Sequence, residues 1–143
     1  MEKKDLIETA SLLTKPSDEA SADYVSKGNK MVNMLNEKLS QRSDINHLIG
    51  ERNLDMMFDN HQNHLRFMSS MFKDYNPVVF AETVLWVFRA YRSHGFKQTY
   101  WPAQLNNWVE IMKTELKPAS FDEVYPFYHW MIVNTPHFSV MSD

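Results

Sequence analysis

Apolar residues recur along most of this chain at the spacing of an α-helix, and no segment alternates apolar and polar residues as a strand does. The pattern is interrupted at residues that commonly end or begin helices, among them Pro16, Gly50, Gly95 and Pro118. It predicts helices over about residues 3–13, 17–39, 44–49, 54–75, 77–94, 99–116 and 120–135. The sequence therefore predicts an all-α fold, a bundle of six to seven helices.

The expected helices form a single domain over residues 1–143, with an N-terminal helical extension over 1–16 and a core over 17–135. Ser17 and Asn53 stand where N-caps are expected. Ser120 and Glu123 have the spacing of a capping box for the last helix. That helix is expected to bend or begin as a 3₁₀ turn at Pro126 and to end before Pro136.

Two histidines share the apolar face of the helix expected over 54–75. On a helical wheel they fall in one arc with seven apolar or aromatic residues: Met57, Phe58, Leu65, Met68, Met71, Phe72 and Tyr75. A buried imidazole needs a hydrogen-bond partner or a ligand. One interpretation is structural, with His61 and His64 each bonded to a tyrosine or a backbone carbonyl. The other is that the two rings, about one turn apart, share a ligand or a metal.

A metal site is not expected, because two histidines supply too few ligands. Further donors, His129, Glu82 or His94, contribute only if the tertiary structure brings them close. The Glu-x-x-His pairs of a di-iron bundle are absent from the sequence.

The segment 77–94 is apolar nearly all round and is therefore expected at the centre of the domain, with Phe88 and Trp108 in the core. Glu82, Trp86 and Arg89 nevertheless fall on one side of it, at positions i, i+4 and i+7. This trio is either a surface stack or the centre of a homodimer interface, where Trp and Arg are common.

Composition narrows the possible functions. The net charge of −3 argues against a nucleic-acid partner, and the lack of cysteine excludes disulfides and thiolate metal sites. The first residues carry mixed charges rather than the apolar run of a signal peptide, and no apolar stretch is long enough for membrane insertion, so we expect a cytoplasmic protein. We find no phosphate loop, nucleophile elbow or paired carboxylates, so nothing indicates an enzyme.

Three groups of residues carry a resemblance to a known family: Asn60-His61-x-x-His64-x-x-Phe67, the run from Trp86 to Phe96, and Trp108. Together they resemble the haem-free, globin-like sensor domains found at the N-terminus of stressosome-type regulators or standing alone as signalling proteins. The resemblance covers about residues 53–133. It implies a globin-like fold, an apolar cavity that holds a fatty acid or stays empty, a homodimer and a signalling-protein partner. Residues 84–95 also resemble helical bundles that cap cobalamin, but the cobalamin-binding Asp-x-His-x-x-Gly motif is absent.

We therefore expect a sensory or regulatory domain that binds a small, largely apolar ligand such as a fatty acid. The residues expected at the ligand are His61, His64, Met57, Met68, Met71, Tyr91, Trp108 and His129. A ligand carboxylate would bond an imidazole, and binding would then strengthen as pH falls through the imidazole's range. No cofactor is expected. The main alternative is a haem-binding globin, in which His94 would be proximal and His61 or His64 distal. A further alternative is a helical partner-binding or dimerisation module that binds no small ligand.

Overall fold

The computed structural model describes residues 1–141, and this part of the chain forms seven α-helices and no strand. The all-α prediction is therefore confirmed. The helices are α1 (Lys3–Ala10), α2 (Asp18–Ser40), α3 (Ile45–Ile49), α4 (Leu54–Lys73), α5 (Pro77–Arg92), α6 (Tyr100–Glu115) and α7 (Pro118–Met141).

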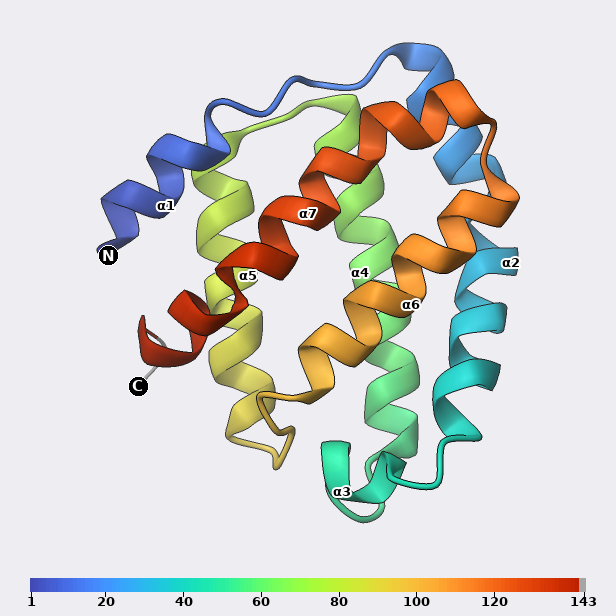
Figure 1. Ribbon diagram of the computed structural model, residues 1–143, viewed down its shortest axis with the longest axis vertical. Coiled ribbons are helices and arrows are strands. Elements are labelled where there is room, and N and C mark those ends of the chain that lie inside the picture. Colours follow the sequence, from blue (N-terminus) through green and yellow to red (C-terminus); the bar gives the residue numbers. More distant parts are fainter. Residues whose placement is uncertain (142–143) are drawn as a thin grey trace.

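The long helices form two layers. In Figure 1, α2, α4 and α5 run roughly alongside one another, and α6 and α7 cross obliquely in front of them. Helix α2 packs against α4, α6 and α7, whereas α5 packs mainly against α1 and α7. Helices α4 and α5, although consecutive in the chain, make little direct contact with each other. This separation leaves room for the cavity described below.

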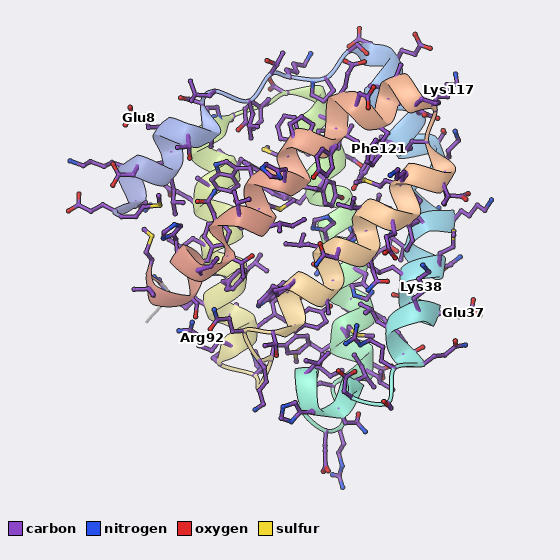
Figure 2. The ribbon with its side chains drawn as sticks, in the orientation of Figure 1. Glu8, Glu37, Lys38, Arg92, Lys117 and Phe121 are labelled. Carbon is purple, nitrogen blue, oxygen red and sulfur yellow. The ribbon has the colours of Figure 1, made fainter. Side chains whose placement is uncertain are left out.

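Aromatic side chains fill much of the space between the layers. The ring of Phe127 on α7 lies 5.2 Å from that of Phe72, 5.0 Å from that of Tyr75 and 5.8 Å from that of Phe80. Charged side chains such as those of Glu8 and Lys38 lie at the periphery in Figure 2. Phe88 and Trp108 are buried, as the hydrophobic pattern predicted.

The N-terminus of α2 is capped as expected and is also bonded to α7. Ser17 Oγ accepts a hydrogen bond from the backbone N–H of Ala20 (3.1 Å). The backbone N–H and the hydroxyl of Ser17 donate to the two oxygens of Glu123 (2.8 and 3.0 Å). Ser120 is an internal residue of α7, which begins at Pro118, so the capping box expected from Ser120 and Glu123 is wrong. Glu123 instead joins the second turn of α7 to the start of α2.

Asn53 stands at the N-cap position of α4, as expected, but its side chain makes no capping hydrogen bond. Its side-chain amide donates to the carbonyl oxygens of Ile49 (2.7 Å) and His94 (2.9 Å) and so joins the turns after α3 and α5. Both turns contain a glycine with positive φ, Gly50 (+87°) and Gly95 (+101°), a conformation that other residues rarely adopt. The amide of Asn53 is thus used for a tertiary contact rather than a local one.

Helix α7 continues past the predicted end. It runs through Pro126 and Pro136 to Met141, although each proline lacks the N–H that would bond the preceding turn. Just before Pro136, the side chains of Asn134 and Thr135 donate to the carbonyl oxygens four residues earlier (2.8 and 2.9 Å). Beyond the proline, Phe138 is fully buried, and this burial favours continuation of the helix.

Helix α1 is part of the same core rather than an extension of it. Leu6 and Ala10 are fully buried, and the indole N–H of Trp130 donates to Thr9 Oγ1 (2.9 Å). The hydroxyl of Tyr75 donates to the carbonyl of Ala10 (2.6 Å). The core expected over 17–135 therefore takes in residues on both sides of that range.

None of the helices within residues 1–141 combines the length and the apolar character needed to cross a bilayer.

The aromatic cluster generates a first prediction. Phe127→Ala removes a fully buried ring and should lower the free energy of unfolding by about 3–5 kcal/mol. Val133→Ala, on the same helix but half exposed, should change it by no more than about 0.5 kcal/mol. Urea denaturation followed by circular dichroism measures both values. Equal midpoints for Phe127→Ala and the wild type would contradict the assigned core.

Candidate functional site

Helix α4 presents two adjoining faces to the rest of the protein. Met57, His61 and Met68 lie on one face and are fully buried. On the helical wheel Asn60, Asn63, His64 and Phe67 occupy a neighbouring arc of about 100°. Each histidine belongs to a different face, so the two rings have separate surroundings.

His61 joins three helices through both ring nitrogens. Its Nδ1 lies 2.6 Å from Asn36 Oδ1 on α2, and its Nε2 lies 2.8 Å from the hydroxyl of Tyr100 on α6. Because an amide oxygen can only accept, Nδ1 carries the proton, and Nε2 accepts from Tyr100. Every polar atom of this buried ring is therefore satisfied by the protein.

Asn60 and Gln104 form a second buried polar pair beside His61. Gln104 Nε2 on α6 donates to Asn60 Oδ1 on α4 (2.6 Å), and the hydroxyl of Tyr100 lies 3.3 Å from the same oxygen. Asn60 is 4% exposed and Gln104 1% exposed. Two amides at this depth fix the distance between α4 and α6.

His64 ends a chain of buried hydroxyls. Its Nε2 lies 2.8 Å from the hydroxyl of Tyr128 on α7, which lies 2.7 Å from the hydroxyl of Tyr24 on α2. If Tyr24 donates to Tyr128 and Tyr128 donates to His64, both hydroxyl protons have an acceptor. In the reverse direction the proton of Tyr24 has none among residues 1–141. The first arrangement places the imidazole proton of His64 on Nδ1.

Burial holds both imidazoles in the neutral form. Desolvation, and after it the neighbouring His64, lowers the pKa of His61 to about 3. Desolvation also lowers the pKa of His64 to about 3. Burial raises the pKa values of Tyr24, Tyr100 and Tyr128, so these hydroxyls stay protonated and act as donors.

A cavity of about 270 Å³ lies between α4, α5, α6 and α7. Its lining is mostly apolar and aromatic: Phe67, Val84, Trp86, Val87, Phe88, Tyr91, Trp101, Leu105, Met131 and Phe138. The remaining lining residues are Asn60, Asn63, His64, Thr83 and Gln104. Trp86 and Asn63 are exposed, so the cavity meets the surface beside them.

Only two of the residues expected at a ligand, His64 and Tyr91, line this cavity. Met57, His61 and Met68 lie on the neighbouring face of α4, and Met71 and Trp108 are buried outside the lining. His129 is exposed on α7, where its ring lies 5.8 Å from that of Tyr125. The sequence pattern could not separate the two faces of α4, because the cavity-lining face combines Asn60, Asn63 and His64 with Phe67 and so gives no apolar signal of its own.

The trio expected at a dimer interface lies on the outer side of α5. Trp86 is 62% exposed, and Glu82 forms an ion pair with Lys3 of α1 (3.5 Å). Arg89 is exposed one turn further along. The exposed residues Val78 and Val79 lie on the same helix.

Neither a metal nor a haem fits the residues present. Within residues 1–141, no three His, Asp or Glu side chains lie close enough together to hold a metal ion. His94 follows α5 on an exposed turn and does not line the cavity, so it is not placed as a proximal ligand. His64 is the one histidine of the lining, and its Nε2 is bonded to Tyr128. A haem iron would therefore lack an available imidazole.

Several residues of this site were not found from the sequence. They are Asn36, Gln104 and the three tyrosines Tyr24, Tyr100 and Tyr128, which come from α2, α6 and α7. Only Gln104 could have been found from the sequence. It lies on the helical wheel beside Trp101, Leu105 and Trp108, which form the inward face of its helix, and this position indicates a buried polar side chain. Which polar residue meets which histidine depends on how the helices pack.

Searches against protein-family models, curated proteins and solved structures find no match to this chain.

The neutral histidines generate a prediction about acid stability. Between the folded pKa near 3 and the ordinary value of 6.5, the unfolded chain binds more protons than the folded one. Stability should therefore be constant above about pH 6.5 and fall as the pH is lowered below it. The loss from pH 7 to pH 5 should be about 1–2 kcal/mol for each histidine.

Urea titrations at several pH values measure this loss. A variant with His61→Gln and His64→Gln should show a much smaller pH dependence over the same range, whatever its stability at pH 7. A wild-type midpoint that is the same at pH 7 and pH 5 would contradict the assignment of two buried neutral imidazoles.

Proposed function

We propose that the protein is a cytoplasmic, non-enzymatic sensory or regulatory domain that binds a small, largely apolar ligand in the cavity between α4, α5, α6 and α7. The supporting observation is the lining itself, which is apolar over most of its surface and polar where Asn60, His64 and Gln104 meet. Ligand sites in proteins typically combine a wide apolar surface with a few polar groups that fix orientation. A fatty-acid-like molecule, with an apolar body and one polar head, matches this arrangement.

The arrangement of α4 and α5 also supports the proposed likeness to haem-free globin-like sensor domains. Helix α4 carries His64, α5 supplies Val84, Val87 and Tyr91 from the opposite side, and the cavity separates them. A haem-binding globin is less well supported, because α5 carries no histidine. In this proposal a ligand changes the distance between α4 and α5, and a signalling partner responds to that change.

The exposed side of α5 supports a second proposal, that two copies of the chain pair through this helix. Trp86 is 62% exposed, and the apolar side chains of Val78 and Val79 on the same helix are exposed as well. A tryptophan at the centre of an interface contributes more than most residues. Because Trp86 also lines the cavity mouth, such a pair would cover the access to the cavity.

Filling the cavity tests the first proposal. Val87→Phe adds a ring at a lining position and should weaken the binding of an eight-carbon probe, octan-1-ol, at least tenfold. Val140→Phe makes the same change at an exposed position of α7, outside the lining, and should leave binding unchanged. Native mass spectrometry detects bound cargo, and ligand-dependent stabilisation should reach about 2.7 kcal/mol at a concentration of 100 times Kd. A wild-type protein that carries no cargo, and whose free energy of unfolding is changed by none of the ligands added, would refute the proposal.

Removing the exposed indole tests the second proposal. If Trp86 lies at the centre of a homodimer, Trp86→Ala should give a monomer with unchanged helicity, because the side chain contributes little to the fold of one copy. Val140→Ala, at an exposed position on α7, is the control and should leave the dimer intact. Light scattering at high micromolar concentration measures the mass. A monomeric wild-type protein would return Glu82, Trp86 and Arg89 to an ordinary surface role.

A further inference from the structure

The polar part of the cavity wall contains hydrogen-bonding atoms that the protein does not use. Gln104 donates to Asn60 Oδ1 through Nε2, which leaves Gln104 Oε1 and Asn60 Nδ2. Neither of these two atoms has a hydrogen-bond partner among residues 1–141. They are not among the fully enclosed unpaired atoms of the described residues, which are Ser21 Oγ and Trp108 Nε1, so a molecule in the cavity can reach them. An accessible, unpaired acceptor and donor in a mostly apolar wall are the kind of polar groups that orient a ligand.

His64 adds a second unused donor to the same wall. The hydroxyl chain from Tyr24 through Tyr128 places the proton of His64 on Nδ1, as derived above. No acceptor for this Nδ1 lies within the described part of the chain. The wall therefore offers two donors, Asn60 Nδ2 and His64 Nδ1, and one acceptor, Gln104 Oε1.

This wall carries no charge. The lining contains no Lys, Arg, Asp or Glu, and the titratable side chains in it are those of His64 and Tyr91. Arg66 bonds Asn63 Oδ1 (3.1 Å), but it lies on the exposed side of α4 and outside the lining. An ionised carboxylate placed here would lose its hydration without gaining a cation, which is costly. An uncharged head group meets no such penalty.

We propose that the cavity selects ligands whose polar head is uncharged and both donates and accepts a hydrogen bond, as a primary alcohol does. The hydroxyl would donate to Gln104 Oε1 and accept from Asn60 Nδ2 or His64 Nδ1. The volume of about 270 Å³ corresponds to about nine water-sized groups, which matches an eight-carbon alcohol. This inference rests on the proposed function, keeps its small and largely apolar ligand, and replaces the fatty-acid carboxylate by an uncharged head group.

Three probes of similar size test the inference at pH 7: octan-1-ol, octanoate and butylbenzene. Calorimetric titration of the wild-type protein should show octan-1-ol binding at least tenfold more tightly than octanoate, because octanoate is ionised at this pH. Butylbenzene, which has an apolar body and no head group, should bind more weakly than octan-1-ol.

Two pairs of variants show whether the polar wall causes this preference. Gln104→Leu removes the acceptor and should weaken the binding of octan-1-ol about tenfold while changing the affinity for butylbenzene less than twofold. Gln98→Leu, at an exposed position outside the cavity, is its control and should change neither affinity. Asn63→Lys places a cation at the cavity mouth and should strengthen octanoate at least fivefold. Asn106→Lys, exposed on α6 outside the lining, is its control.

The outcomes separate this inference from the proposed function. Octanoate binding as tightly as octan-1-ol, or butylbenzene binding as tightly as either, would overturn the uncharged-head inference and leave the ligand-binding proposal standing. Failure of all three probes to bind the wild-type protein would overturn both. If Gln104→Leu does not fold, the Asn63→Lys variant still decides the matter, since octanoate binding that is unchanged by the added cation would contradict the charge argument.

Discussion

The need to satisfy a buried imidazole on α4 determines much of this structure. His61 is fully buried, and its two nitrogens are bonded to Asn36 of α2 and Tyr100 of α6. Leaving either nitrogen unpaired would cost about 1–3 kcal/mol. This cost favours one relative position and one rotation of α2, α4 and α6 about their axes, the one in which Asn36 and Tyr100 both reach the ring. The apolar contacts around this point are less directional, and they adapt to the arrangement that the hydrogen bonds require.

A second hydrogen-bond chain makes the same demand on the other side of α4. His64 bonds Tyr128 of α7, and Tyr128 bonds Tyr24 of α2. Between them, the two chains tie α4 to α2, α6 and α7, whereas α5 is held chiefly by α1 and α7. The cavity opens where α4 lacks such a tie, namely toward α5. Residues of α6 and α7 also line it, and the ring of Phe67 on α4 stacks on that of Phe80 on α5 (6.1 Å), so the cavity occupies only part of the space between α4 and α5.

The same network decides what the cavity wall can recognise. Gln104 Nε2 donates to Asn60 Oδ1, which leaves Gln104 Oε1 and Asn60 Nδ2 without a partner among the described residues. His64 uses Nε2 to bond Tyr128 and leaves Nδ1. Because burial keeps the imidazoles neutral, these groups form hydrogen bonds without contributing charge. Recognition at this wall therefore depends on the direction of hydrogen bonds more than on electrostatic attraction.

The sequence by itself determined the helices, since helical periodicity and the residues Ser17, Gly50 and Gly95 are local signals. It also placed His61 and His64 on the inward side of α4. The tertiary structure alone decided that the two histidines face different neighbours, that Glu123 bonds Ser17, and that α7 continues past Pro136. Each of these depends on residues far apart in the chain, and a helical pattern gives the inward side of a helix but not the neighbour that covers each part of it.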